Sequence, residues 1–180
     1  MAAIKRRQSA EVSGPRDPSR AAGRRRSQAD LIAFVELMFF AYRDFTGEPD
    51  KILADYGLGR AHHRVLHFVD RQPGMRVADL LETLMITKQS LARVLKQLVD
   101  DGWIHTQAGE LDRRERLLFT TERGKALAAR LAERQMARIE AALEAAGGTS
   151  DDALRRFLLA MIASEEQPKV ARRMTVQGGQ

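Results

Sequence analysis

The side chains best placed to do chemistry in this sequence lie in the stretch TKQSLARVLK, residues 87–96. Leu91, Leu95 and Leu98 recur at helical spacing, so one stripe of a helix can be buried while its other faces stay polar. Hydrogen-bonding groups in a first helical turn can read base edges in a major groove, and cations further along can meet phosphates. We therefore expect a DNA-reading helix whose contact residues are Thr87, Lys88, Gln89, Ser90, Arg93 and Lys96.

A short β-hairpin is predicted directly after this helix. Thr87 can cap the start of the helix, and Gly102 can take the left-handed conformation that ends it. Strand-like runs follow at 103–106 and 116–119. The connection 108–114 holds one glycine and four charged side chains, so it should face solvent and not the core.

Further helices must position this unit, because apolar residues recur on both sides of it at spacings of three and four. Gly47 and Pro49 should end the first of them, and 51–56 can form one more helical turn. The helix expected at 77–84 stops three residues before the DNA-reading helix, which is the spacing of a helix-turn-helix. The expected helices cover 28–46, 60–71, 77–84, 121–146 and a last segment from Thr149 or Ser150 past Ile162.

Composition narrows the possible classes of protein. The chain has 180 residues, of which 44% are hydrophobic, enough for one domain with a real core. No apolar run approaches the roughly 18 residues of a membrane span, and we expect a soluble, cytoplasmic protein without a membrane partner. The absence of cysteine excludes disulfides, a thiolate nucleophile and cysteine-ligated zinc.

The net charge of +6 resides in the first 27 residues, which hold eight basic and two acidic side chains. This segment contains few large apolar residues and should be a disordered basic arm. Such an arm can attract DNA phosphates or reach into an adjacent groove. It can equally be a solubilising extension without a partner, and the sequence leaves both readings open.

Catalysis is not expected. Four histidines are present, and two of them, His63 and His67, have the spacing of two metal ligands on one helix face. No third ligand motif lies beside them, so we expect an ordinary pair and neither a metal site nor a cofactor. The sequence also has no phosphate-binding glycine loop, no Gly-x-Ser-x-Gly elbow and no His-Glu-x-x-His motif.

The helices outside the DNA-reading unit carry broad apolar faces that something must cover. A second copy of the chain is the economical cover, and we expect a homodimer. Two copies would place their reading helices about one DNA turn apart, roughly 34–36 Å, facing a palindrome. The alternative is that these faces pack on one another within a single subunit.

The order of these elements and three local stretches resemble the MarR family of winged helix-turn-helix transcription regulators. The stretches are ITKQSLARVLKQL, LVDDGWI and LDRRERLLFTTERGKAL, and the similarity covers roughly residues 28–165. The resemblance implies a mainly α winged helix-turn-helix fold, with flanking N- and C-terminal dimerisation helices and one small β-hairpin wing. It also implies a homodimer that binds double-stranded operator DNA and responds to a small-molecule effector.

By position, the resemblance assigns Thr87, Lys88, Gln89, Ser90 and Arg93 to the recognition helix and Asp112, Arg113 and Arg114 to the wing tip. In such wings an aspartate orients an arginine into the minor groove, here Asp112 with Arg114, and a narrow A·T-rich groove suits a guanidinium. The pair can also be an exposed ion pair of little energetic weight. Gln89 suits an adenine edge.

Two positions depart from the family pattern. Leu81 stands where relatives usually have a small alanine, and Met85 stands where a glycine usually makes the turn. Both side chains are bulkier than a close helix crossing prefers. We expect them to affect the position of the recognition helix, and so the operator sequence, more than the fold.

The sequence thus predicts a homodimeric, sequence-specific DNA-binding regulator, a repressor in preference to an activator, whose affinity for a pseudo-palindromic operator changes with a small-molecule ligand. The alternatives are a DNA-coating protein without sequence preference and a protein-binding module on the same fold. Candidate ligand-binding residues near the junction of the two lobes are Phe39, Tyr42, Arg43, His62, Leu66 and Trp103. The expected regions are the arm 1–27, a dimerisation helix and connector 28–56, the DNA-binding region 57–120, dimerisation helices 121–166 and a loose tail 167–180.

Overall fold

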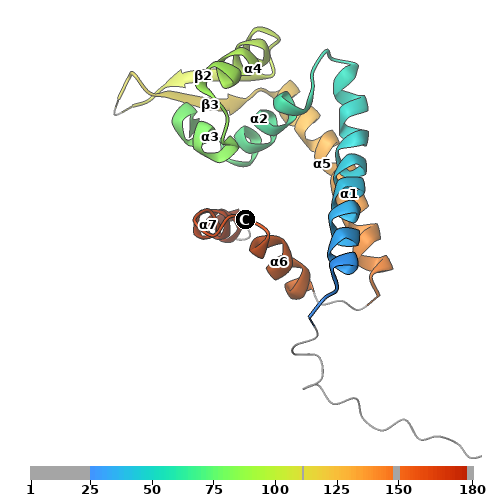
Figure 1. Cartoon of the computed structure of the whole chain (residues 1–180). Helices are drawn as coiled ribbons and strands as arrows, with labels where there is room; N and C mark the ends of the chain where they lie inside the picture. The colour runs from blue at the N-terminus through green and yellow to red at the C-terminus, as the bar shows by residue number, and fades with distance from the viewer. Residues whose placement is uncertain (1–24, 111, 148–150, 178–180) are drawn as a thin grey trace, which may run out of the picture. The chain divides into compact units, whose positions relative to one another are not determined.

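A computed structural model describes residues 25–110, 112–147 and 151–177, so most of the predicted basic arm lies outside the described residues. The chain divides into two compact units within its first helix, one ending at Phe39 and the other beginning at Phe40. Figure 1 shows the elements in chain order: α1 (Gln28–Ala54), α2 (Arg60–Arg71), β1 (Met75–Arg76), α3 (Val77–Leu84), α4 (Lys88–Asp100), β2 (Ile104–Ala108), β3 (Arg116–Thr120), α5 (Glu122–Ala145), α6 (Asp151–Ala160) and α7 (Gln167–Gln177).

The first helix is longer than the sequence indicates. We predicted a break at Gly47 and Pro49, but α1 continues through both residues to Ala54. Pro49 and Leu53 are fully buried, and Thr46 is nearly so. Tertiary burial of this face therefore outweighs the hydrogen bond that the proline cannot make and its poor helix propensity.

The helix-turn-helix follows the sequence prediction closely. The bounds of α2 and α3 are those expected, and α4 starts after Thr87, whose side chain accepts a hydrogen bond from the Ser90 amide. Met85 ends α3 in the left-handed conformation, with φ 51° and ψ 45°. Met85 thus adopts a backbone geometry that a glycine would take more easily. Its amide donates to the Leu81 carbonyl at 2.9 Å.

The sheet has one strand more than predicted. Strands β2 and β3 form the expected hairpin, with Ile104 opposite Thr120 and Ala108 opposite Arg116. The two-residue strand β1 pairs with the other edge of β3, so the order is β1-β3-β2 and every pair is antiparallel. A strand this short gives no periodicity that the sequence could reveal.

The hydrophobic core lies in the winged helix-turn-helix, where α2 packs against α3, α4, α5 and β3. Its fully buried side chains come from all of these elements, from β1 and β2, and from the end of α1. They include Leu53, Leu66, Met75, Leu80, Leu91, Leu98, Ile104, Leu118 and Leu131.

The C-terminal region also differs from the prediction. Residues 167–177 form the helix α7 and not a loose tail. Pro168 lies in the first turn of α7, where a proline costs no hydrogen bond. The Lys169 ammonium lies 2.7 Å from a Glu82 carboxylate oxygen of α3 and 3.1 Å from Glu166, and these pairs tie the start of α7 to α3. No described helix combines the length and the apolar character that a membrane span requires.

Candidate nucleic-acid interface

The first turns of α4 present the predicted DNA-contacting side chains to solvent. Lys88, Gln89 and Arg93 are all exposed. Thr87 and Ser90 are also exposed, but they serve the helix start: Thr87 Oγ1 accepts from the Ser90 amide at 3.2 Å and donates to Ser90 Oγ at 2.9 Å.

At the other end of the predicted set, Lys96 forms an ion pair with Asp100 one turn later in α4. Lys88, Gln89 and Arg93 are thus exposed near the start of the helix, and Lys96 lies about two turns further along, paired with Asp100.

Two polar contacts hold α4 at Gln97, one to α2 and one to the residues that precede α2. A ring nitrogen of His62, Nε2, lies 2.9 Å from Gln97 Oε1, and Gln97 Nε2 donates to the Gly57 carbonyl at 3.2 Å. The other ring nitrogen, Nδ1, accepts from the Gly59 amide at the start of α2. His62, one of the predicted ligand-binding residues, links α2 to α4. Sequence reasoning missed Gln97, because its partners lie 35 and 40 residues away.

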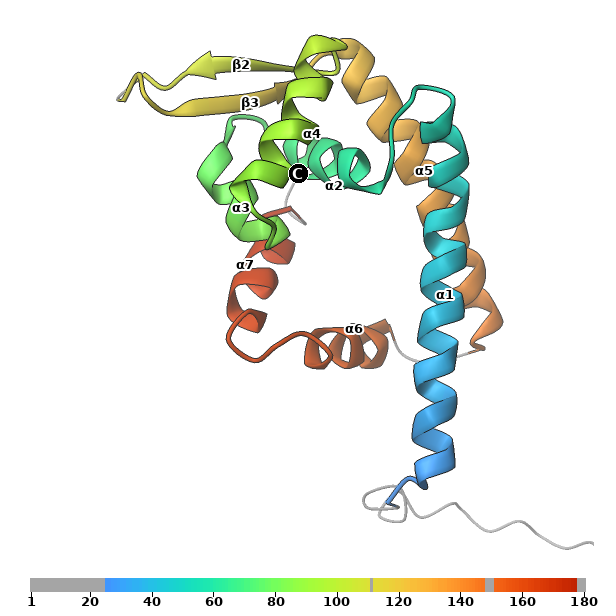
Figure 2. The same cartoon turned by 45° about the horizontal axis from the view of Figure 1, so that its top comes forward.

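The hairpin β2–β3 is the wing, and Figure 2 shows it extending beyond α3 and α4. Asp112, Arg113 and Arg114 are exposed at its tip. The Asp112 carboxylate accepts a hydrogen bond from the Arg114 backbone amide at 2.9 Å. Asp112 therefore shapes the turn from which the Arg114 side chain projects.

Strand β1, beside the wing, holds a residue that the sequence did not single out. Arg76 donates to both carboxylate oxygens of Asp79, at 2.9 and 2.7 Å, and to Glu115 Oε1 at 3.1 Å. The Arg76 hydrogen bond holds the pKa of the Asp79 carboxyl below its ordinary value, and the two carboxylates raise the pKa of Arg76. Arg76 is therefore held in place as a charged partner of two acids.

Comparison with known proteins shows which family this winged helix-turn-helix belongs to. The MarR family model matches residues 56–115. The HTH-type transcriptional regulator PetP of Rhodobacter capsulatus is 48% identical over 128 residues, which is 71% of this chain and 77% of PetP. The chain belongs to the MarR family.

Two solved structures have the same fold. FabT of Streptococcus pneumoniae in complex with DNA aligns with a TM-score of 0.60 at 16% identity, over 71% of this chain and 89% of FabT. The transcriptional repressor CouR, bound to a 23-mer DNA duplex, aligns with a TM-score of 0.54 at 26% identity, over 72% of this chain and 86% of CouR. As a member of the MarR family, the chain is a winged-helix transcription regulator.

A cavity of about 490 Å³ opens beside α2 in this MarR-family chain. Its apolar walls include Tyr42, Phe45 and Phe68, and its polar lining includes Arg60, Thr46, Gln135, His63, Arg64 and His67. Burial lowers the pKa of both histidines, and the charges of His67 and Arg71 respectively act in the same direction. Among the described residues, no group of three or more potential ligands is arranged to hold a metal ion.

The predicted ligand-binding residues of this family member are scattered. Tyr42 lines the cavity, whereas Leu66 and Trp103 are buried in the core at 1% and 2% exposure. Phe39 is exposed on α1, and Arg43 forms an ion pair with Asp44 at 2.7 Å. Of the predicted ligand-binding residues only Tyr42 is among those that line this cavity, because helix faces alone do not reveal which side chains share a cavity.

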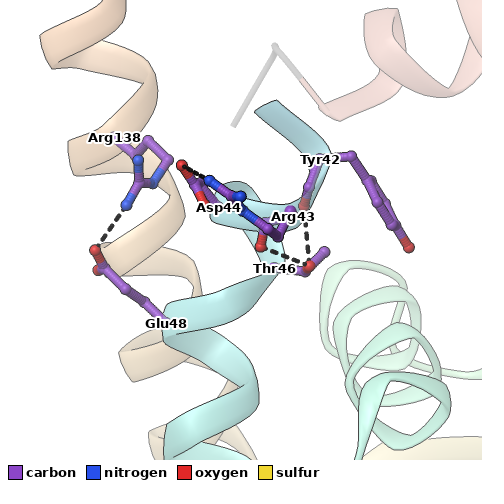
Figure 3. Close-up of polar contacts among 6 residues, drawn as sticks. All are labelled: Tyr42, Arg43, Asp44, Thr46, Glu48 and Arg138. Atoms are coloured by element: carbon purple, nitrogen blue, oxygen red, sulfur yellow. Dashed lines mark hydrogen bonds and ion pairs between the residues drawn. The ribbon is translucent and has the colours of Figure 1, made fainter. Parts of the chain in front are cut away.

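One ion pair joins α1 to α5, and two further polar contacts lie within α1, as Figure 3 shows. Arg138 of α5 donates to Glu48 of α1 at 2.8 Å, and the neighbouring Arg43–Asp44 pair lowers the pKa of the Asp44 carboxyl. The Thr46 hydroxyl donates to the Tyr42 carbonyl at 2.9 Å within α1. These contacts fix the helical wall on which Tyr42 stands.

The junction of α4, the wing and α5 is closed around Trp103. The guanidinium of Arg123 lies 3.7 Å from the centre of the indole ring, and the Tyr56 ring meets it edge-on at 5.1 Å. The side chain of Thr121 caps α5 by accepting from the Gly124 amide at 3.0 Å, and its hydroxyl donates to the Gly102 carbonyl at 2.8 Å. The recognition helix, the wing and α5 thus share one anchored corner.

Proposed function

We propose that this protein is a homodimeric, sequence-specific regulator that binds a pseudo-palindromic operator in duplex DNA and represses transcription. A small-molecule effector changes its affinity for that operator. In this proposal the recognition helix α4 enters the major groove and the tip of the wing enters the adjacent minor groove.

The observation that carries the proposal is the polarity of α4. The buried face of α4 carries Leu91, Val94 and Leu98, while Lys88, Gln89 and Arg93 stand exposed near the start of the helix. Contacts from α2 hold the helix at Gln97. An exposed amide beside two cations, on a helix held at Gln97, suits base reading with phosphate anchoring. On the wing, Asp112, Arg113 and Arg114 are the proposed minor-groove contacts.

A second copy of the chain is the partner that the apolar surface of α1 favours. Large apolar side chains are 41–70% exposed along this helix. Apolar surfaces of this kind are typical of a protein interface. The exposed α1 residues are Leu31, Ile32, Phe34, Val35, Leu37, Met38, Phe39, Phe40 and Tyr42.

The cavity beside α2 is the proposed effector site. Its volume suits a small molecule, and its aromatic walls and arginine side chains favour an aromatic or aliphatic anion. A ligand bound there acts by favouring one arrangement of the two reading heads over another. Repression accords with CouR, a transcriptional repressor in its DNA-bound structure.

Selection of bound fragments from sheared genomic DNA tests the proposal against a DNA-coating protein and a protein-binding module. We expect a saturable preference of about 10³ or more for one palindrome over random duplex. The variant with Lys88→Ala and Gln89→Ala should lose this preference while it stays folded. Equal binding of all fragments by the wild-type protein would contradict sequence-specific recognition, and no retention of DNA would contradict the whole proposal.

A further inference from the structure

We propose that Arg76 and Glu115 are positioning residues of DNA recognition: together they hold the wing at the angle from which its tip meets the minor groove. This inference rests on the proposed function. It adds two residues that make no DNA contact themselves but determine where Asp112, Arg113 and Arg114 lie.

Arg76 uses its whole guanidinium fork within the protein. Nε and Nη2 bind the two oxygens of Asp79, and Nη1 binds Glu115. A planar fork with both edges occupied fixes the direction of each partner more tightly than a single ammonium could. Because two carboxylates already neutralise it, Arg76 is a poor phosphate ligand, and its role is internal.

The three partners belong to three different elements. Arg76 ends β1, opposite Leu117 of β3, and Asp79 lies in the first turn of α3. Glu115 lies in the wing tip, beyond the last strand pair between Ala108 and Arg116. The pair Arg76–Glu115 therefore ties the tip to the helix-turn-helix at a point that strand pairing does not reach.

Glu115 is itself an integral part of the tip. Its amide donates to the Asp112 carbonyl at 3.0 Å, and its carbonyl accepts from the Gly109 amide at 3.0 Å. A Cβ atom on Gly109 would lie 2.7 Å from the Asp112 carbonyl oxygen, so the turn closes too tightly for a side chain there. Because Glu115 is hydrogen-bonded to Asp112 and Gly109, a tether at Glu115 also orients Asp112 and Arg114.

The Arg76–Glu115 ion pair should affect operator affinity strongly and the free energy of unfolding little. The Arg76 and Glu115 side chains are 50% and 40% exposed. Exposed ion pairs of this kind contribute little to the free energy of unfolding. A minor-groove contact at the end of a hairpin, however, is lost after a small rotation, because guanidinium insertion depends on groove width and depth.

The test compares Glu115→Gln with Glu110→Gln, because Glu110 is exposed on the same tip and carries the same charge. Removal of a negative charge near DNA should by itself strengthen binding. We expect Glu110→Gln to bind operator as tightly as wild type or more tightly. Glu115→Gln should weaken binding by about fivefold or more, the lower end of what one specific contact contributes.

A second readout distinguishes a positioning role from a merely structural one. Operators with A·T or G·C pairs at the position of the wing are compared at equal salt, together with the thermal midpoint of unfolding. We expect Glu115→Gln and Arg76→Ala to lose the preference for A·T at an unchanged midpoint. Arg76→Lys keeps the positive charge but not the planar guanidinium, so this variant should retain only part of the A·T preference.

The variant Arg114→Ala distinguishes a failure of the positioning role from a failure of the proposed role of the wing in DNA binding. If Arg114→Ala weakens binding while Glu115→Gln behaves like Glu110→Gln and keeps the A·T preference, the positioning role of Arg76 and Glu115 is wrong and the proposed function stands. If Arg114→Ala also leaves operator affinity unchanged, the wing takes no part in recognition, and this inference and the proposed role of the wing both fail.

Discussion

At the scale of single residues, Gly124 carries a constraint that its place in a helix does not suggest. It lies in the first turn of α5, packed against the backbone that leads from α4 into the wing. A Cβ atom built on Gly124 would lie 2.1 Å from the Trp103 carbonyl oxygen. Backbone cannot move aside as a flexible side chain can, so the close approach of α5 to this corner requires glycine.

We therefore predict that Gly124→Ala lowers the free energy of unfolding by about 1–3 kcal/mol, the range of an overpacked core site. Urea unfolding followed by circular dichroism measures this. Gly47→Ala is the matched control, because a Cβ at Gly47 meets nothing within 4 Å and Gly47 lies inside α1. It should raise stability by about 0.5–1 kcal/mol. Equal effects of the two substitutions would contradict the packing argument.

Local signals account for the residues that the sequence predicted correctly. Thr87 and Thr121 were identified as helix caps, and both side chains accept the expected backbone hydrogen bonds. A cap is visible in sequence because its partner lies three residues away. The pair Arg76–Glu115 spans 39 residues, and nothing in either neighbourhood indicates the other partner.

At the scale of elements, α2 combines structural and titrating roles. His63 and His67 lie on its face toward the cavity. Burial is the largest cause that lowers the pKa of each, and Asp50 and Asp70 respectively oppose it. Because the folded-state pKa lies below the ordinary value of 6.5, the unfolded chain binds more protons in this range. The free energy of unfolding is therefore not reduced by these two histidines above about pH 6.5. It decreases as the pH falls from there toward and through their folded-state pKa.

We predict that the free energy of unfolding decreases as the pH falls below about 6.5, and that the double substitution His63→Gln and His67→Gln flattens this slope. Urea titrations at several pH values provide the measurement. Gln135→Ala, which removes a side chain of the same cavity that does not titrate, is the control and should leave the slope in place. The carboxylates with lowered pKa, such as Asp79, start from 3.8 and act at lower pH. A wild-type slope of zero would refute this role of α2.

The element boundaries show where sequence reasoning works and where it fails. The ends of α2 and α3 were predicted to the residue because glycine, proline and apolar spacing act locally. The prediction failed at Pro49, where burial of α1 overrides the local signal, and at α7, where a pairing with α3 accompanies a helix in a polar segment. Both failures come from contacts between distant segments.

At the scale of the whole molecule, the prediction concerns the second copy of the chain. Phe39 is 70% exposed on α1 and lies in the proposed dimer surface. An aspartate there would bury an unpaired charge in the interface, which is strongly unfavourable. We expect Phe39→Asp to be monomeric at micromolar concentration and to lose about 10²-fold or more in operator affinity, because the two reading heads then bind independently.

Light scattering after size-exclusion chromatography and an operator titration test this expectation. Glu36→Lys, one turn earlier in α1, changes a charge without removing apolar surface and should keep the wild-type mass. A wild-type protein that is already monomeric, or a Phe39→Asp variant with the wild-type mass, would exclude α1 as the dimer surface.

The corner around Trp103 offers a built-in optical probe. The chain has one tryptophan, and its indole lies between the Arg123 guanidinium and the edge of Tyr56. A nearby cation and the exclusion of water both affect the emission of an indole. Intrinsic fluorescence at this site should therefore follow any shift of the wing against α5 as operator or effector is added, without a label on the protein.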